Sequence, residues 1–131
     1  MTSIQDFVVQ GGQAVTAGEV ATFREHIAAY KLKAETLEVA GQSALREKAS
    51  FLIRYIEDVL DDEYIAGDFG ALPESVFAVR YLAKGVDIIP DSVPGVGYSD
   101  DAAVVGVVLI GHAEEFRSYG AKVGVDYDAL V

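Results

Sequence analysis

One stretch of the sequence limits the fold more than any other. Residues 81–101, YLAKGVDIIPDSVPGVGYSDD, place two of the three prolines and four aspartates between apolar flanks. Pro90 and Pro94 lack an amide donor and fix φ, so no regular helix continues through them. Gly85 can end a helix before the prolines, and Ser99-Asp100-Asp101 suits the start of the next one. The stretch therefore predicts a hinge between two helices.

Two apolar stripes with helical spacing precede this hinge. Thr16 and Glu19 have the spacing of a capping box, which predicts a helix that begins there and ends at Gly41. The second helix follows after the short connection Gln42-Ser43, so the two are expected to form an antiparallel hairpin. Steps of three and four residues put each stripe on one helix face. The stripes are Val20, Phe23, Ile27, Tyr30, Ala34 and Leu37, then Leu45, Ala49, Leu52, Ile56, Leu60 and Tyr64.

The remaining segments predict shorter or less regular elements. Ser3 can cap a first helix, but Gly11-Gly12 is expected to interrupt it. Pro73 fits the first position of a helix that runs to about Lys84. The next helix, 102–119, is apolar almost all round for three turns, which predicts the most buried element of the fold.

These segments together predict an all-α fold. At 131 residues the chain fits one helical domain spanning 1–131, with an antiparallel helical hairpin packed on a helix–hinge–helix unit and a buried C-terminal helix. Residues 120–131 show no helical period, so this tail is expected to be extended or mobile.

Composition excludes several classes of function. The net charge of −11 argues against unaided binding to nucleic acid or to an anionic membrane, because both depend on Lys and Arg. The absence of cysteine excludes disulfides, zinc–thiolate sites and thiol nucleophiles. The N-terminus lacks the pattern of a secretory signal, and a cytoplasmic location is expected.

A membrane-spanning segment is not expected either. The longest apolar run, Ala102 to Gly111, is about half the ~20 residues that a transmembrane helix needs. Arg80, Lys84 and Asp87 make insertion of the hinge region into a bilayer costly. Contact with a membrane surface is a less favoured alternative.

The hinge carries a family resemblance. The motifs Asp87-Ile88-Ile89-Pro90-Asp91, Pro94-Gly95-Val96-Gly97-Tyr98 and Asp100-Asp101 make residues 72–110 similar to the YkvA-like domain family. This chain has Gly85 where members commonly have proline, and Ser92 and Ser99 replace typical apolar residues. The resemblance implies a family of unknown activity, some members of which associate with membranes.

The four hinge aspartates, Asp87, Asp91, Asp100 and Asp101, are the candidate metal ligands. A tight turn would bring their carboxylates together, and Ca²⁺ or Mg²⁺ prefers such oxygen ligands. The other interpretation is structural, with Asp87 and Asp91 bonding backbone amides in turns while Asp100 and Asp101 cap the following helix. This structural interpretation is favoured, because caps and turns explain every one of the four.

Two other charged features have ordinary explanations. The run 57–63, EDVLDDE, places like charges four residues apart near a helix end, which predicts basic residues nearby or a basic partner. His112 and Glu115 have the i, i+3 spacing of a hydrogen-bonded pair on a helix. Neither histidine lies in a recognisable metal or catalytic spacing.

The sequence leaves two classes of function open. We expect a non-enzymatic helical scaffold or protein-interaction module, which acts as a homo-oligomer or with an unknown protein partner. The alternative is a domain that binds Ca²⁺ or Mg²⁺ at the acidic hinge, with or without metal-dependent hydrolysis. No residue pattern equips the chain for nucleophilic catalysis.

Overall fold

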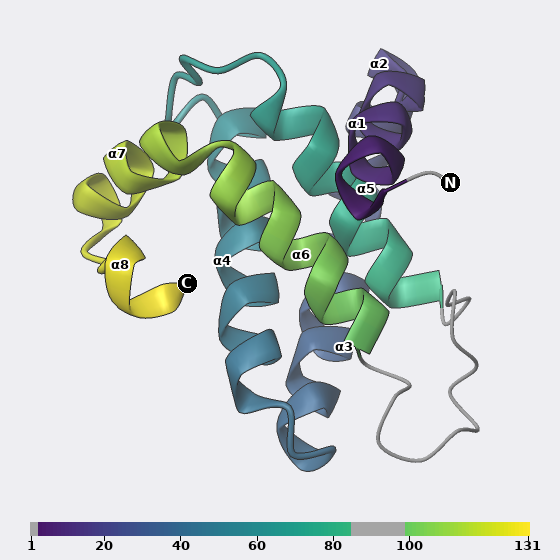
Figure 1. Cartoon of the computed structure of the whole chain (residues 1–131). Helices are drawn as coiled ribbons and strands as arrows, with labels where there is room; N and C mark the ends of the chain where they lie inside the picture. The colour runs from purple at the N-terminus through teal and green to yellow at the C-terminus, as the bar shows by residue number, and fades with distance from the viewer. Residues whose placement is uncertain (1–2, 85–98) are drawn as a thin grey trace.

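The computed structural model describes residues 3–84 and 99–131, and within them the regular secondary structure is entirely helical (Figure 1). The predicted all-α fold is thereby confirmed. The helices are α1 Ile4–Ala14, α2 Ala17–Phe23, a 3₁₀ turn Arg24–His26, α3 Ile27–Val39, α4 Ser43–Leu60, α5 Ala71–Lys84, α6 Ser99–Gly111, α7 Ala113–Val123 and α8 Tyr127–Leu130.

The predicted helical hairpin is present, with one change. The capping box forms at Thr16 and Glu19, where each side chain accepts from the other residue's amide at 3.1 Å. The expected single helix is divided into α2, the 3₁₀ turn and α3, yet its stripe still faces inward. α3 ends before Gly41, whose φ of 78° is readily adopted only by glycine. α3 and α4 then lie side by side (Figure 1).

Contrary to the prediction, the glycine pair Gly11-Gly12 does not interrupt α1. Ser3 caps α1 by accepting from the amide of Asp6 at 3.0 Å, and the helix continues through Gly11 and Gly12 to Ala14. A Cβ on Gly12 would lie 2.5 Å from Cγ of Glu74 in α5. The glycines therefore allow α1 to approach α5 closely, which sequence periodicity does not reveal.

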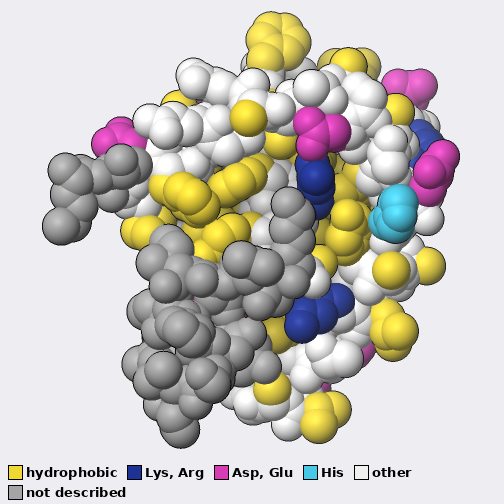
Figure 2. All heavy atoms as spheres, turned by 90° about the vertical axis from the view of Figure 1, so that its right-hand side faces the viewer, with side chains coloured by type: hydrophobic (Ala, Val, Ile, Leu, Met, Phe, Trp, Pro, Cys, Tyr) yellow, Lys and Arg dark blue, Asp and Glu magenta, His cyan; other side chains and the backbone are white. Residues whose placement is uncertain are grey.

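Aromatic side chains fill the contact between α1 and α5. Phe7 of α1 meets Phe77 and Tyr81 of α5 edge-on, with ring centroids 5.3 and 5.6 Å away. Such edge contacts add about 0.5–1.5 kcal/mol beyond the buried area. Hydrophobic side chains gather on this side of the molecule, which is formed by α1, α2 and α5 (Figure 2).

The helices on either side of the hinge pack against each other. α5 begins at Ala71, so Pro73 is its third residue rather than its first, and α5 ends at Lys84 as expected. α6 begins at Ser99 and lies against α5, α1 and α4. Residues 85–98, the greater part of the predicted hinge, lie outside the described residues.

The predicted helix 102–119 is wrong in two respects. It consists of two helices, α6 and α7, separated at His112. It is also not buried all round: Val104, Val105, Val108 and Leu109 face the core, whereas 68% of Ile110 is exposed. Because α6 has apolar residues on every face, the sequence does not determine which side of it is buried. Packing against α1, α4 and α5 decides which side faces the core.

Contrary to the prediction of an extended segment, the C-terminal tail is helical. α7 continues to Val123, Gly124 adopts φ 77°, and the short helix α8 follows. Tyr127 is 5% exposed, and its hydroxyl donates to the carbonyl of Leu109 at 2.7 Å. One buried aromatic residue thus fixes the tail against α6, and a single such anchor has no periodicity to detect.

The acidic run at the end of α4 obtains its basic neighbours from within the fold. Lys31 donates to Glu57 at 3.1 Å, and Arg24 pairs with Asp61. Asp58 accepts from the buried Tyr119 and lies 3.9 Å from Arg54. The prediction that basic residues of the chain relieve this repulsion is confirmed.

The glycines of α1 and α6 yield a matched pair of substitutions. Gly12→Ala should lower the free energy of unfolding, because the added methyl meets Glu74, including backbone atoms at 3.3 Å, and overpacking costs about 1–3 kcal/mol. Gly106→Ala should raise it by up to about 1 kcal/mol, because among the described residues its Cβ meets open space. Urea denaturation measures both. Equal effects of the two substitutions would contradict the close approach of α1 to α5.

Candidate functional site

The structure describes two of the four predicted metal ligands. Asp100 and Asp101 lie in the first turn of α6 and are 5% and 4% exposed. The hydroxyl of Tyr81 in α5 donates to Asp100 at 2.7 Å. Asp87 and Asp91 lie outside the described residues, so whether the four carboxylates converge stays a prediction. Within the part of the chain that is described, no group of three or more His, Cys, Asp or Glu side chains is arranged to hold a metal ion.

A histidine between two carboxylates joins three segments of the fold. His112, between α6 and α7, lies 2.6 Å from Asp68 through Nδ1 and 3.1 Å from Glu74 through Nε2. Asp68 precedes α5, and its other oxygen accepts from the amide of Gly70 at 2.9 Å. Glu74 lies in the first turn of α5. We call Asp68, His112 and Glu74 the histidine clasp.

The charges of the clasp support one another. Burial disfavours the imidazolium, but the hydrogen bonds and charges of Asp68 and Glu74 outweigh burial and raise the pKa of His112. Burial also opposes ionisation of Asp68, yet the bond from His112 and the amides of Gly70 and Ala71 lower the pKa of Asp68. A protonated ring donates from both nitrogens, so the clasp is a triad of mutually stabilising charges.

The clasp replaces the predicted pairing of His112 with Glu115. Glu115 is 7% exposed and accepts instead from the hydroxyl of Tyr55 at 2.7 Å and the amide of Gly67 at 3.1 Å. Burial of Tyr55 is the main cause that raises the pKa of its hydroxyl above the ordinary value, and the hydrogen bond to Glu115 is the second cause. Glu115 and His112 therefore both hold the connection between α4 and α5, but through different residues of it.

The geometry of the clasp limits its chemistry. Both ring nitrogens of His112 already face carboxylates, so neither is directed at a nucleophilic side chain. Asp68 and Glu74 each direct one oxygen at a different nitrogen of the ring. The arrangement fits a structural role better than a role in proton transfer. This role is at the end of a surface groove.

That surface feature is a groove of about 660 Å³ between α1 and α6. We call it the α1–α6 groove. Its floor and walls include Ile4 and Val9 of α1 and Val107 and Ile110 of α6, and it ends at Glu74 and His112. Val9 is 43% exposed and Ile110 is 68% exposed. Apolar residues thus line an open surface instead of the core.

Small residues and acidic side chains complete the lining of the groove, beside His112 of the clasp. Gly106 and Gly111 also line it, and a Cβ on either would meet no atom of the described residues within 4 Å. Asp6 and Glu74 are its acidic side chains, and the described residues that line it include neither Lys nor Arg. The groove is therefore apolar at its centre and negative at its edge.

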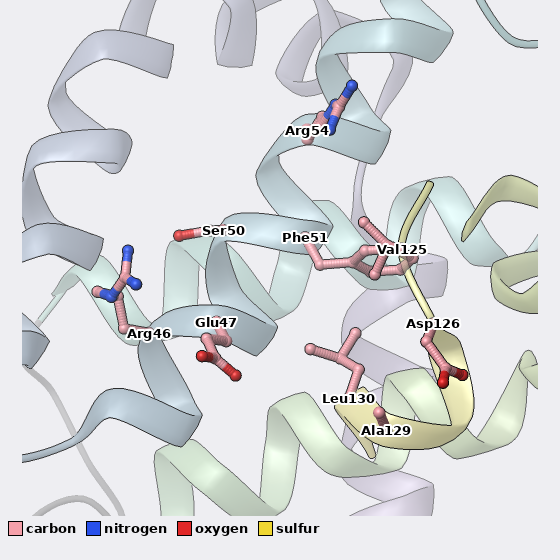
Figure 3. A pocket seen from close by; sticks show the side chains of 9 residues that line it. All are labelled: Arg46, Glu47, Ser50, Phe51, Arg54, Val125, Asp126, Ala129 and Leu130. Carbon is pink, nitrogen blue, oxygen red and sulfur yellow. The ribbon is translucent and has the colours of Figure 1, made fainter. Parts of the chain in front are cut away.

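A second pocket, between α4 and α8, is less suited to a ligand. It measures about 410 Å³ and has an apolar side formed by Phe51, Val125 and Leu130 (Figure 3). Its two cations, Arg46 and Arg54, lie apart on α4 and do not converge (Figure 3). Arg46 is also engaged by Glu38 at 2.8 Å and Glu35 at 3.2 Å. The pocket thus lacks a common point at which an anion would be held.

Sequence reasoning missed both the clasp and the groove. Asp68 and Glu74 reach His112 from more than thirty residues away along the chain, and pairings this distant have no local pattern. One signal was present: Gly111 next to His112 weakens the predicted long helix at that point. The groove arises from which side of α6 is covered, and that is a tertiary property.

Comparison with known proteins identifies a partial family match. Residues 75–107 match a family model described as a protein of unknown function, DUF1232. The match covers about a quarter of the chain, from α5 to α6, and includes Asp100 and Asp101. No curated protein and no solved structure matches the chain. No helix in the described ranges is long and apolar enough to cross a membrane.

The clasp predicts how stability varies with pH. His112, with its pKa raised above 6.5, stabilises fully below about 6.5, and this contribution is lost as pH rises through the folded-state pKa. Asp68, with its pKa lowered, stabilises above 3.8, and this is lost as pH falls through its folded-state pKa. The clasp therefore contributes most between about pH 4 and 6.5.

Substitution of His112 isolates this contribution. His112→Asn should cost about 1.5–3 kcal/mol at pH 5.5, the range for a hydrogen bond to a charged group, and the cost should shrink by pH 9. Urea denaturation at the two pH values measures the difference. His26→Asn, at an exposed histidine of the 3₁₀ turn, is the control. A cost that does not depend on pH would show that His112 is neutral in the folded chain.

Proposed function

We propose that this chain is a non-enzymatic helical module that binds another protein through the α1–α6 groove. The observation that supports the proposal is the open apolar lining of the groove, above all the exposure of Val9 and Ile110. Burial of a side chain such as Ile or Val is worth about 1.5–3 kcal/mol, so a partner gains most by covering these two. Contiguous exposed apolar surface of this kind marks interaction sites.

The clasp supports the same function by keeping the groove in shape. His112 ties the end of α6 to Asp68 and Glu74, and α1 is set against Glu74 through Gly12. The two walls of the groove are therefore held in place by contacts that are already formed in the free chain. A preformed site avoids the ordering cost that weakens association.

The family match is compatible with a narrower assignment. Residues 75–107 lie within the region 72–110 that resembles the YkvA-like family, and we propose membership of that family. The proposal adds no activity, because the matched family is one of unknown function. The function proposed here is therefore based on the groove.

A divalent cation at Asp87, Asp91, Asp100 and Asp101 is the second candidate. Burial of two carboxylates in the first turn of α6 is the observation that favours it. Ca²⁺ or Mg²⁺ at a hundred times its Kd would stabilise the fold by about 2.7 kcal/mol, and Asp101→Asn should abolish that gain. A thermal melt measures this, and no shift at millimolar metal would dismiss the cation.

Site-specific cross-linking tests the interaction proposal. A photoreactive benzoylphenylalanine replaces Ile110 in the full chain in its native host, and irradiation should give a discrete adduct larger than the chain. Leu32 of α3 is the matched control, because it is also 68% exposed but lies outside the groove. Position 32 should give no such adduct.

The mass of the adduct separates the possible partners. Twice the mass of the chain would identify a second copy, and any other discrete mass would identify a different protein. Absence of an adduct at position 110, or the same adducts at both positions, would contradict the proposed function.

A further inference from the structure

We infer that the partner segment in the α1–α6 groove is an amphipathic α-helix that carries Lys or Arg beside its apolar stripe. This inference rests on the proposed function and names the chemistry of the partner. Three properties of the groove lead to it: the spacing of the apolar residues on α6, the open space above Gly106, and the sign of the charges at the edge.

The exposed side of α6 has the spacing that a second helix requires. Ala103, Gly106, Val107 and Ile110 follow one another at steps of three, one and three residues, and all four line the groove. Residues three and four apart form ridges on a helix surface, and ridges of one helix fit the grooves of another. The opposite wall, α1, adds Ile4 and Val9. A helix laid along α6 would therefore touch apolar side chains on both walls.

Gly106 sets how closely that helix can approach. Glycine inside a helix costs up to about 1 kcal/mol relative to alanine, and at Gly106 no neighbouring atom of the described chain occupies the space of a Cβ. Gly12 differs, because Glu74 of α5 fills the corresponding space. α5 packs closely against α1 at Gly12, and a helix of another protein can pack against α6 at Gly106 in the same way.

The charges select the sign of the partner. Asp6 is exposed on α1, and the described lining contains no Lys or Arg. At the end of the groove Glu74 is paired with His112, but the clasp sets two carboxylates, Asp68 and Glu74, against one imidazolium. The whole chain carries −11, so a second copy would bring the same charge to the interface. A basic helix is attracted both by the edge of the groove and by the field of the chain. The inference is therefore a foreign basic helix and not a homodimer.

Two fluorescent peptides about as long as the 13-residue α6 test this inference on the full chain. Both peptides have the same stripe of Leu and Ala on one face; the other positions are Lys and Gln in one and Glu and Gln in the other. Fluorescence anisotropy measures their Kd at about 50 and 150 mM salt. The Lys peptide should bind at least about tenfold more tightly than the Glu peptide at the lower salt, and salt should weaken it.

Substitutions distinguish the groove from general charge attraction. Gly106→Leu adds a side chain to the groove without changing the charge and should weaken the Lys peptide about tenfold. The open space above Gly106 lets the variant fold, and its helical circular dichroism confirms that it has. Leu32→Glu adds a negative charge outside the groove and should not weaken binding. Asp6→Asn should weaken binding of the Lys peptide and should not weaken binding of the Glu peptide, which the Asp6 charge repels.

The outcomes are unambiguous. Equal binding of the Lys peptide to the native chain and to Gly106→Leu would overturn the inference, and so would Glu-peptide binding as tight as that of the Lys peptide. If either occurs while the cross-link at position 110 is present, only the chemistry of the partner is wrong. If the cross-link is also absent, the proposed function fails with it.

Discussion

Glu74 lies where three helices meet, and its surroundings fix much of the fold. Glu74 belongs to α5. Its carboxylate accepts a hydrogen bond from His112 at the end of α6, and its Cγ fills the space left open by Gly12 of α1. Glu74 and His112 each have only 13% of their side chains exposed, so their interaction is far less screened than one at the surface. Loss of His112 would leave the buried Glu74 without this partner, whereas loss of Glu74 would leave His112 paired with Asp68 alone.

The groove follows from this arrangement. α1 is placed against α5 by its glycines, and α6 is fixed at its end by the clasp, so α1 and α6 form two walls with an open apolar surface between them. Covering α6 completely would need another element at Ile110, and within the described residues none lies there. The acidic Asp6 at its edge and the net charge of the chain are the basis for the proposed preference for basic partners.

The sequence predicts features that depend on neighbouring residues and misses those that depend on distant ones. The stripes from Val20 to Leu60 and the capping box at Thr16 are local, and the structure confirms them. Tyr64, expected at the end of the second stripe, lies beyond α4, which ends at Leu60. Gly11-Gly12 predicts a break in α1 that does not occur, because the approach of α5 that explains these glycines is tertiary. His112 divides a predicted helix because its partners, Asp68 and Glu74, are distant in the chain.

The candidate site shows the same division. The acidic hinge is prominent in the sequence, and the structure describes Asp100 and Asp101 as buried at the start of α6, with Asp100 bonded to Tyr81. The groove has no motif at all, because apolar residues on every face of α6 concealed which of them would stay exposed. Composition bears only on the sign of the proposed partner, since a net charge of −11 disfavours anionic partners whatever the fold of the chain.

The exposure of the groove is the central claim, and solvent accessibility measured by NMR tests it most directly. A soluble gadolinium chelate broadens methyl signals according to their distance from solvent. In the free full chain, the methyls of Ile110 and Val9 should be broadened strongly, whereas those of Val108 and Leu109 should be protected. Protection of Ile110 equal to that of Val108, at every protein concentration, would show that the chain covers its own groove and would contradict the account.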